Sequence, residues 1–97
     1  IMDIPEGYSV RIHPRSGMAL KQGITLINCE GVIDSDYVDP TFITLYNSSD
    51  SAVTISDGDR VAQGELIKNE QYTLASITEK PAQKTSRAGG FGSTGVN

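Results

Sequence analysis

Apolar and polar residues alternate along much of the chain, with the period of two residues that is typical of half-buried β-strands. The alternating segments are 8–13, 23–28 and 42–47, with further candidates at 52–56, 60–68 and 72–78. Turn-forming residues separate them at 5–7, 39–40, 47–50 and 57–58. No stretch has a sustained helical stripe, and one short helical turn is expected near 17–22. The pattern predicts an all-β domain, an antiparallel sandwich or barrel.

The alternation ends near Glu79, where the sequence becomes EKPAQKTSRAGGFGSTGVN, rich in Gly, Ser, Thr and Lys. Such a segment does not bury enough apolar surface to order itself. We therefore expect a β-domain at 1–78 and a flexible C-terminal arm at 79–97 that functions by docking. The aromatic ring of Phe91 among exposed amides and hydroxyls suits closure over a flat, polar ligand, whereas a glycine-rich terminus taken alone is more often a solvated tail.

Composition excludes several classes of partner. The 97 residues, 37% of them hydrophobic, support one small domain. The net charge of −4 argues against binding duplex nucleic acid, which needs a basic face, so any phosphate site must be local. The single Cys29 forms no intrachain disulfide, which makes the cytoplasm the simplest location. No apolar run is long enough for a membrane span, and one Cys with one His excludes a zinc cluster.

Four glycine-containing clusters occur in one order along the chain. They are HPRSGMA at 13–19, GVIDSDY at 31–37, GDRVAQ at 58–63 and GGFGSTG at 89–95. Each cluster taken singly has an ordinary structural interpretation as a turn with solvated charges beside it. All four together, spanning nearly the whole chain from Val10 to Gly95, resemble the dUTPase family. The resemblance implies a distorted jelly-roll-like β-barrel or sandwich, the β-clip of dUTPases, in a homotrimer.

The resemblance also implies an activity, the magnesium-dependent hydrolysis of dUTP to dUMP and pyrophosphate. Asp34 matches the residue that activates the water attacking the α-phosphorus. Tyr37 matches the ring beneath the deoxyribose, which leaves no room for a 2′-hydroxyl. The uracil base would be recognised by the side-chain amide of Asn28, which offers a donor and an acceptor, together with Gly31, Val32 and Ile33 in a β-hairpin.

The remaining site residues are assigned to the phosphates and the closing arm. Phosphate-binding positions by resemblance are Arg15, Ser16, Gly17, Gln63 from a neighbouring subunit, and Arg87, Ser93 and Thr94 of the arm. Within that arm Phe91 would stack on the uracil, with Gly92 beside it. Magnesium would be held through the substrate phosphates and water, with no direct protein ligand. Asp59 and Arg60 are interpreted as structural, and His13 as strand packing.

The sequence departs from the family pattern at three places. An AGYDL-like first motif is absent, so we expect a fragment of a longer protein that lacks an outer-shell magnesium ligand and a strand or two. The arm is one residue shorter between Arg87 and Phe91. The residues after Tyr37 read VDP in place of the usual RGE, and Pro40 lacks the N–H needed for a sheet ladder, which predicts a reshaped hairpin exit.

Two other functions remain open at this point. One is a catalytically weak regulatory relative that binds nucleotide and a protein partner. The other is a relative of dCTP deaminase, which shares the fold and the trimer. For a viral protein, the expected location is the cytoplasm of the host.

Overall fold

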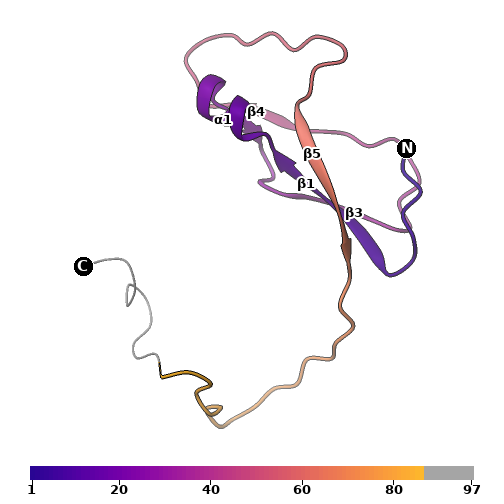
Figure 1. The fold of residues 1–97 in the computed structure, drawn as a ribbon, viewed down its shortest axis with the longest axis vertical. Coiled ribbons are helices and arrows are strands. Elements are labelled where there is room, and N and C mark those ends of the chain that lie inside the picture. Colours follow the sequence, from indigo (N-terminus) through magenta and orange to yellow (C-terminus); the bar gives the residue numbers. More distant parts are fainter. Residues whose placement is uncertain (87–97) are drawn as a thin grey trace.

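The computed structural model describes residues 1–86, which form two antiparallel sheets and one short helix (Figure 1). The elements are β1 Tyr8–Pro14, α1 Ser16–Gln22, β2 Ile24–Leu26, β3 Gly31–Asp34, β4 Leu45–Asn47 and β5 Ala62–Lys68. One sheet has the order β3-β1-β5, and β2 pairs with β4 in the other. The all-β class is confirmed, and the single helix of this part lies where a helical turn was expected.

Strand β1 is the central strand of the larger sheet. On one edge it pairs with β3, in a register that sets Ser9 opposite Asp34 and Ile12 opposite Gly31. On the other edge it pairs with β5 over its full length, from Tyr8 opposite Lys68 to Pro14 opposite Ala62. The alternation read from residues 8–13 therefore belongs to a strand with hydrogen-bonded neighbours on both sides.

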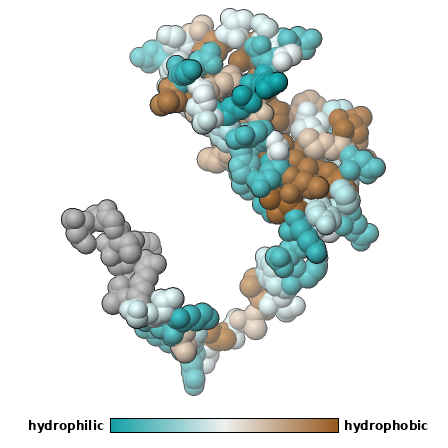
Figure 2. Space-filling view, viewed as in Figure 1, coloured by the Kyte–Doolittle hydropathy of each residue, from teal (hydrophilic) through white to brown (hydrophobic). Residues whose placement is uncertain are grey.

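A small apolar cluster packs against one face of β1. Its buried members are Ile4, Ile12, Leu26 and Ile33, with Met2, Tyr8, Val10, Ile43, Leu45 and Ala62 partly buried around them. Figure 2 shows apolar residues gathered over the sheets, and only isolated ones along the chain that follows β5. Burial of this kind stabilises the fold in proportion to the apolar area removed from water, so a core this thin gives a modest stability.

The other face of β1 carries polar side chains. Ser9 is only 1% exposed, and its hydroxyl donates to Oδ1 of Asn69 at 2.9 Å. The backbone N–H of Asn69 donates to the carbonyl of Gly7 at 2.8 Å. These two bonds join the end of β5 to the start of β1.

Three expectations about the strands are corrected by the structure. Residues 52–56 and 72–78 form no strand, and the two sheets of the described part do not close into a barrel. Alternation produces a strand only where a neighbour supplies hydrogen bonds, and the chain after β5 runs away from both sheets (Figure 1). Its apolar residues are accordingly exposed, Tyr72 to 77% and Leu74 to 86%. Residues 79–86 also contain no helix or strand, so the domain boundary at 78 stays a prediction.

Among the helices of the described residues, none has the length and apolar character needed to cross a membrane.

The turn from α1 into β2 depends on Gly23. Its φ of 70° lies in the left-handed region, and its N–H caps the helix by donating to the carbonyl of Ala19 at 3.2 Å. Its own carbonyl accepts the N–H and the hydroxyl of Ser48, at 2.8 and 2.7 Å. A Cβ at this position would lie 2.9 Å from the Ser48 hydroxyl oxygen. Only glycine fits both the dihedral angle and the space.

We predict that Gly23→Ala lowers the free energy of unfolding by about 1–3 kcal/mol, from left-handed strain together with the clash at Ser48. Urea unfolding followed by circular dichroism measures the change. Gly17→Ala is the matched control, because no atom lies within 4 Å of the place that a Cβ would occupy there and alanine is the better helix former. Equal stability of Gly23→Ala and the unmodified protein would contradict the assignment.

Candidate active site

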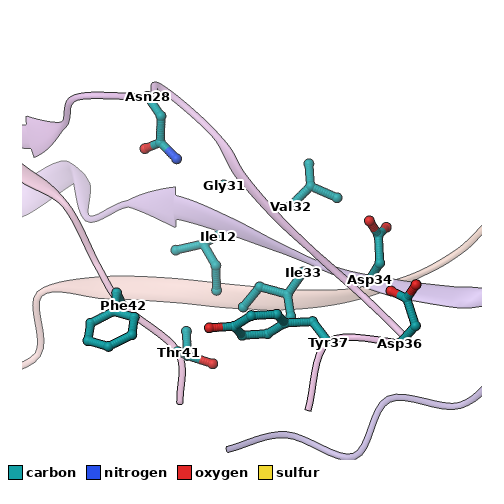
Figure 3. Close-up of a pocket in the computed structure, with 10 residues that line it drawn as sticks. All are labelled: Ile12, Asn28, Gly31, Val32, Ile33, Asp34, Asp36, Tyr37, Thr41 and Phe42. Atoms are coloured by element: carbon teal, nitrogen blue, oxygen red, sulfur yellow. The ribbon is translucent and has the colours of Figure 1, made fainter. Parts of the chain in front are cut away.

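A cavity of about 370 Å³ opens between β1, β3 and the loop that follows β3 (Figure 3). Its lining residues are Ile12, Asn28, Gly31, Val32, Ile33, Asp34, Asp36, Tyr37, Thr41 and Phe42. In Figure 3, Asn28 and Phe42 border one end, the carboxylates of Asp34 and Asp36 border the other, and the ring of Tyr37 lies between. The cavity thus has an amide end, an apolar middle and an acidic end.

Strand β3 supplies one wall of the cavity. Its pairing with β1 uses one edge of the strand, and no strand of residues 1–86 pairs with the other edge. An unpaired strand edge presents backbone N–H and C=O groups. Backbone groups of residues 31–34, as well as side chains, can therefore form hydrogen bonds with a ligand in the cavity.

A tight turn between β2 and β3 positions Asn28. The N–H of Cys29 donates to the carbonyl of Leu26 at 3.1 Å, and Cys29 itself has a φ of 65°. Glu30 donates its N–H to the carbonyl of Asn28 at 2.6 Å, while its carboxylate lies 3.2 Å from Nη1 of Arg11 on β1. The Arg11–Glu30 ion pair ties this turn to the central strand.

Glycine at position 31 leaves room for the Asn28 amide. A Cβ built there would lie 3.4 Å from Nδ2 of Asn28 and 3.4 Å from Cβ of Ile12. Any side chain longer than a methyl group would intrude between these two residues. The small residue therefore lets the amide stand close to the β3 backbone.

Two carboxylates stand at the acidic end of the cavity. Asp34 is the last residue of β3, and the turn after it is closed by the N–H of Tyr37 donating to the Asp34 carbonyl at 3.1 Å. Neither the Asp34 nor the Asp36 carboxylate has an ion-pair partner within the described part of the chain. An unpaired, anchored carboxylate is available to accept a proton or to orient water.

The predicted β-hairpin at 31–37 takes a different form. The strand β3 pairs with β1, and residues 37–44, which would form the second strand of a hairpin, contain no strand. The hydroxyl of Tyr37 donates to the carbonyl of Pro40 at 2.6 Å, which closes the loop on itself. Pro40 has no N–H to donate to a sheet ladder, which agrees with the lack of a strand at residues 37–44, and the reshaping of the hairpin exit relative to the family stays a prediction.

Four phosphate-binding candidates fall within residues 1–86 and lie where β1 ends, and none of these four lines the cavity: Arg15, Ser16, Gly17 and Gln63. Arg15 precedes α1, and Ser16 and Gly17 lie in its first turn, where backbone N–H groups lack intrahelical acceptors. Gln63 faces His13 across the sheet and donates from Nε2 to the carbonyl of Pro14 at 3.2 Å. Gln63 is therefore adjacent to the Arg15–Gly17 segment.

The sheet register keeps these two groups of residues apart. Asp34 lies opposite Ser9, and Arg15 follows Ser9 by six positions along or just beyond β1. At a rise of about 3.3 Å per residue, six positions span about 20 Å. Within the described residues, the acidic end of the cavity and the phosphate candidates at 15–17 and 63 thus lie at opposite ends of β1.

Sequence reasoning assigned a role to six of the lining residues and missed four. The six are Asn28, Gly31, Val32, Ile33, Asp34 and Tyr37, whereas Ile12, Asp36, Thr41 and Phe42 were assigned none. Only Asp36 had a signal, its spacing of two residues from Asp34. The arm candidates Arg87, Phe91, Gly92, Ser93 and Thr94 lie outside the described residues.

No group of three or more His, Cys, Asp or Glu side chains suited to a metal ion is found in residues 1–86. Two carboxylates at the cavity end fit a hard cation that takes most of its ligands from water and phosphate oxygens. They do not fit a cation held entirely by protein.

These features describe a small all-β protein with a ligand cavity beside an open strand edge. A sequence model of the dUTPase family matches residues 1–95, and the chain belongs to this family. It is similar to proteins named deoxyuridine 5′-triphosphate nucleotidohydrolase, at 48% identity over 94 residues in Finegoldia magna and 47% over 97 residues in Rhizobium johnstonii. The one from Caulobacter vibrioides is 44% identical over 93 residues.

These alignments cover 97%, 99% and 96% of this chain, in the same order, and 65%, 61% and 59% of the relatives. The chain therefore spans about three fifths of the length of the curated relatives that it matches.

Proposed function

We propose that the protein is a dUTP diphosphatase, which hydrolyses dUTP to dUMP and pyrophosphate. The observation that carries the proposal is the cavity, which gathers Asn28, residues 31–34 and Tyr37 around one space of about 370 Å³. Membership of the dUTPase family supports the same activity. The chain spans only part of the length of its relatives. The activity is therefore proposed for the whole protein that the gene encodes.

The amide end of the cavity would bind the uracil base. The Asn28 side chain offers one donor group and one acceptor to the edge of a pyrimidine, and the open edge of β3 offers backbone groups of both kinds. A site built to pair with uracil rejects cytosine, because the reversed donor and acceptor pattern leaves buried polar groups unpaired. The Tyr37 ring, held by its bond to Pro40, would pack under the deoxyribose where a 2′-hydroxyl has no room.

Asp34 would accept a proton from the water that attacks the α-phosphorus. Its position at the end of a paired strand holds the carboxylate in place, as a general base requires. Enzymes of this family generally depend on a divalent metal, and we propose Mg²⁺, with Asp34 and Asp36 near its water ligands. When bound, the ion would offset negative charge on the triphosphate.

We further propose a homotrimer with sites shared between subunits. The separation of about 20 Å between Asp34 and Arg15 along β1 places them too far apart to meet at one phosphate group within one copy. Exposed Tyr72, Leu74 and Ile77 on the chain after β5 supply apolar surface for contact between copies.

Sedimentation equilibrium should give three times the mass of one chain. A monomer at micromolar protein concentration would contradict the shared site.

The loop after β3 is the feature that favours the alternative function, a regulatory protein that binds nucleotide and a protein partner. Val38 and Phe42 are 65% and 81% exposed there, which is the kind of surface that a protein partner covers. A dCTP deaminase would need a site for cytosine, and no observation on this cavity favours one. We infer a cytoplasmic location, supported by the single, unpaired Cys29.

The proposal predicts pyrophosphate release from dUTP with Mg²⁺, and none from dCTP, dTTP or UTP. Asp34→Asn should lower kcat by about 10²- to 10⁴-fold, the usual contribution of a general base, while dUMP binding is retained. Asp39→Asn is the matched control, an isosteric change at a nearby carboxylate that does not line the cavity, and should cost less than about 10-fold, because only Asp34 is assigned the proton. Coupled pyrophosphate assays and calorimetry measure the two quantities.

Three outcomes would contradict parts of the proposal. Tight dUTP binding without turnover would favour the regulatory function. Conversion of dCTP to dUTP would favour the deaminase. Normal turnover by Asp34→Asn with loss in Asp36→Asn would move the base to Asp36.

A further inference from the structure

Phe42 combines high exposure with a place in the cavity wall. Its surface is 81% exposed, and the ring borders the cavity at the end where Asn28 lies (Figure 3). A large exposed aromatic residue buries substantial apolar area when a flat ligand covers it. The position therefore suits contact with a ligand more than packing within the chain.

The backbone on both sides of Phe42 is anchored. Ile43 packs against the apolar core, and the carbonyl of Thr44 accepts the N–H of Ile27 at 3.0 Å. On the other side, the Tyr37–Pro40 hydrogen bond closes the loop, and Thr41 is partly buried. Thr41 and Ile43, which flank Phe42, are both partly buried, whereas the Phe42 ring itself is exposed.

The order of groups along the cavity identifies the part of the ligand beside Phe42. The carboxylates of Asp34 and Asp36 border the opposite end, and the Tyr37 ring lies between (Figure 3). If the phosphate that reacts lies at the acidic end and the sugar at Tyr37, the base lies between Asn28 and Phe42. The Asn28 amide then meets the edge of the base, and the Phe42 ring supplies an apolar surface for it.

We propose that Phe42 is a substrate-binding residue that contacts the pyrimidine ring of the bound deoxyuridine nucleotide. This role rests on the proposed function and adds to it a base contact from the body of the domain. It is separate from the contact assigned to Phe91 of the arm. Stacking of a base on an aromatic side chain contributes about 1–3 kcal/mol.

The test compares ligands with and without a base. Phe42→Ala should raise the Kd for dUMP by about 5- to 150-fold, the equivalent of that stacking range, and leave the Kd for 2-deoxyribose 5-phosphate unchanged. Phe42→Tyr should bind dUMP as the unmodified protein does, since it keeps the ring. Isothermal titration calorimetry on the protein as its gene encodes it measures all of these.

A fluorescence measurement does not depend on truncating the side chain. The sequence has no Trp, so Phe42→Trp introduces a local reporter whose emission should be quenched by dUMP and unaffected by 2-deoxyribose 5-phosphate. Tyr46→Trp is the matched control, because Tyr46 is an aromatic residue 49% exposed on β4 that does not line the cavity. Its emission should not respond to dUMP.

Several results would overturn the role of Phe42. Unchanged dUMP affinity in Phe42→Ala, while the unmodified protein binds dUMP, would remove Phe42 and leave the proposed function standing. An equal loss for both ligands would show that the substitution disturbs the fold. If the emission of Phe42→Trp changed with protein concentration and did not change with dUMP, the ring would be assigned to contact between copies of the chain. No dUMP or dUTP binding by the unmodified protein would overturn both proposals.

Discussion

The pairing of β1 with strands on both of its edges is the constraint on which the rest of the structure depends. One face of β1 carries Ile12 into the core, and the other carries Ser9 and Arg11 toward polar partners. The register with β3 decides where Asp34 stands, opposite Ser9, and brings Gly31 opposite Ile12. A shift of one residue would turn every side chain of β3 to the other face and destroy the cavity.

The same register separates two groups of residues that are assigned to the proposed site. The cavity lies along β3, whereas Ser16 and Gln63 lie where β1 ends and β5 begins. The strand pairing fixes their separation along β1. In the proposed homotrimer a second copy would bring them together at one triphosphate, and Tyr72, Leu74 and Ile77 after β5 are exposed apolar residues that such an assembly could cover.

Local patterns in the sequence predicted the elements that have partners within the chain. Alternation predicted β1 and β5, and the expected helical turn ends beside Gly23. The same alternation predicted a strand at 72–78, and this prediction was wrong. A strand needs a neighbouring strand to pair with, and the spacing of apolar residues does not reveal whether one is present. Phe42 was missed for a related reason. Its apolar segment 42–47 was predicted to be a strand, and only the structure shows that Phe42 is exposed and lines the cavity.

The central claim is that the cavity beside β3 binds the deoxyuridine part of a nucleotide. Amide chemical-shift mapping on ¹⁵N-labelled protein titrated with dUMP tests it most directly, because it reports position without requiring turnover. We expect the largest shifts at Asn28, residues 31–34, Tyr37 and Phe42. Shifts confined to residues 67–70 and Tyr72, which line a neighbouring hollow that shares Asp34 with the cavity, or an absence of shifts along β3, would contradict it.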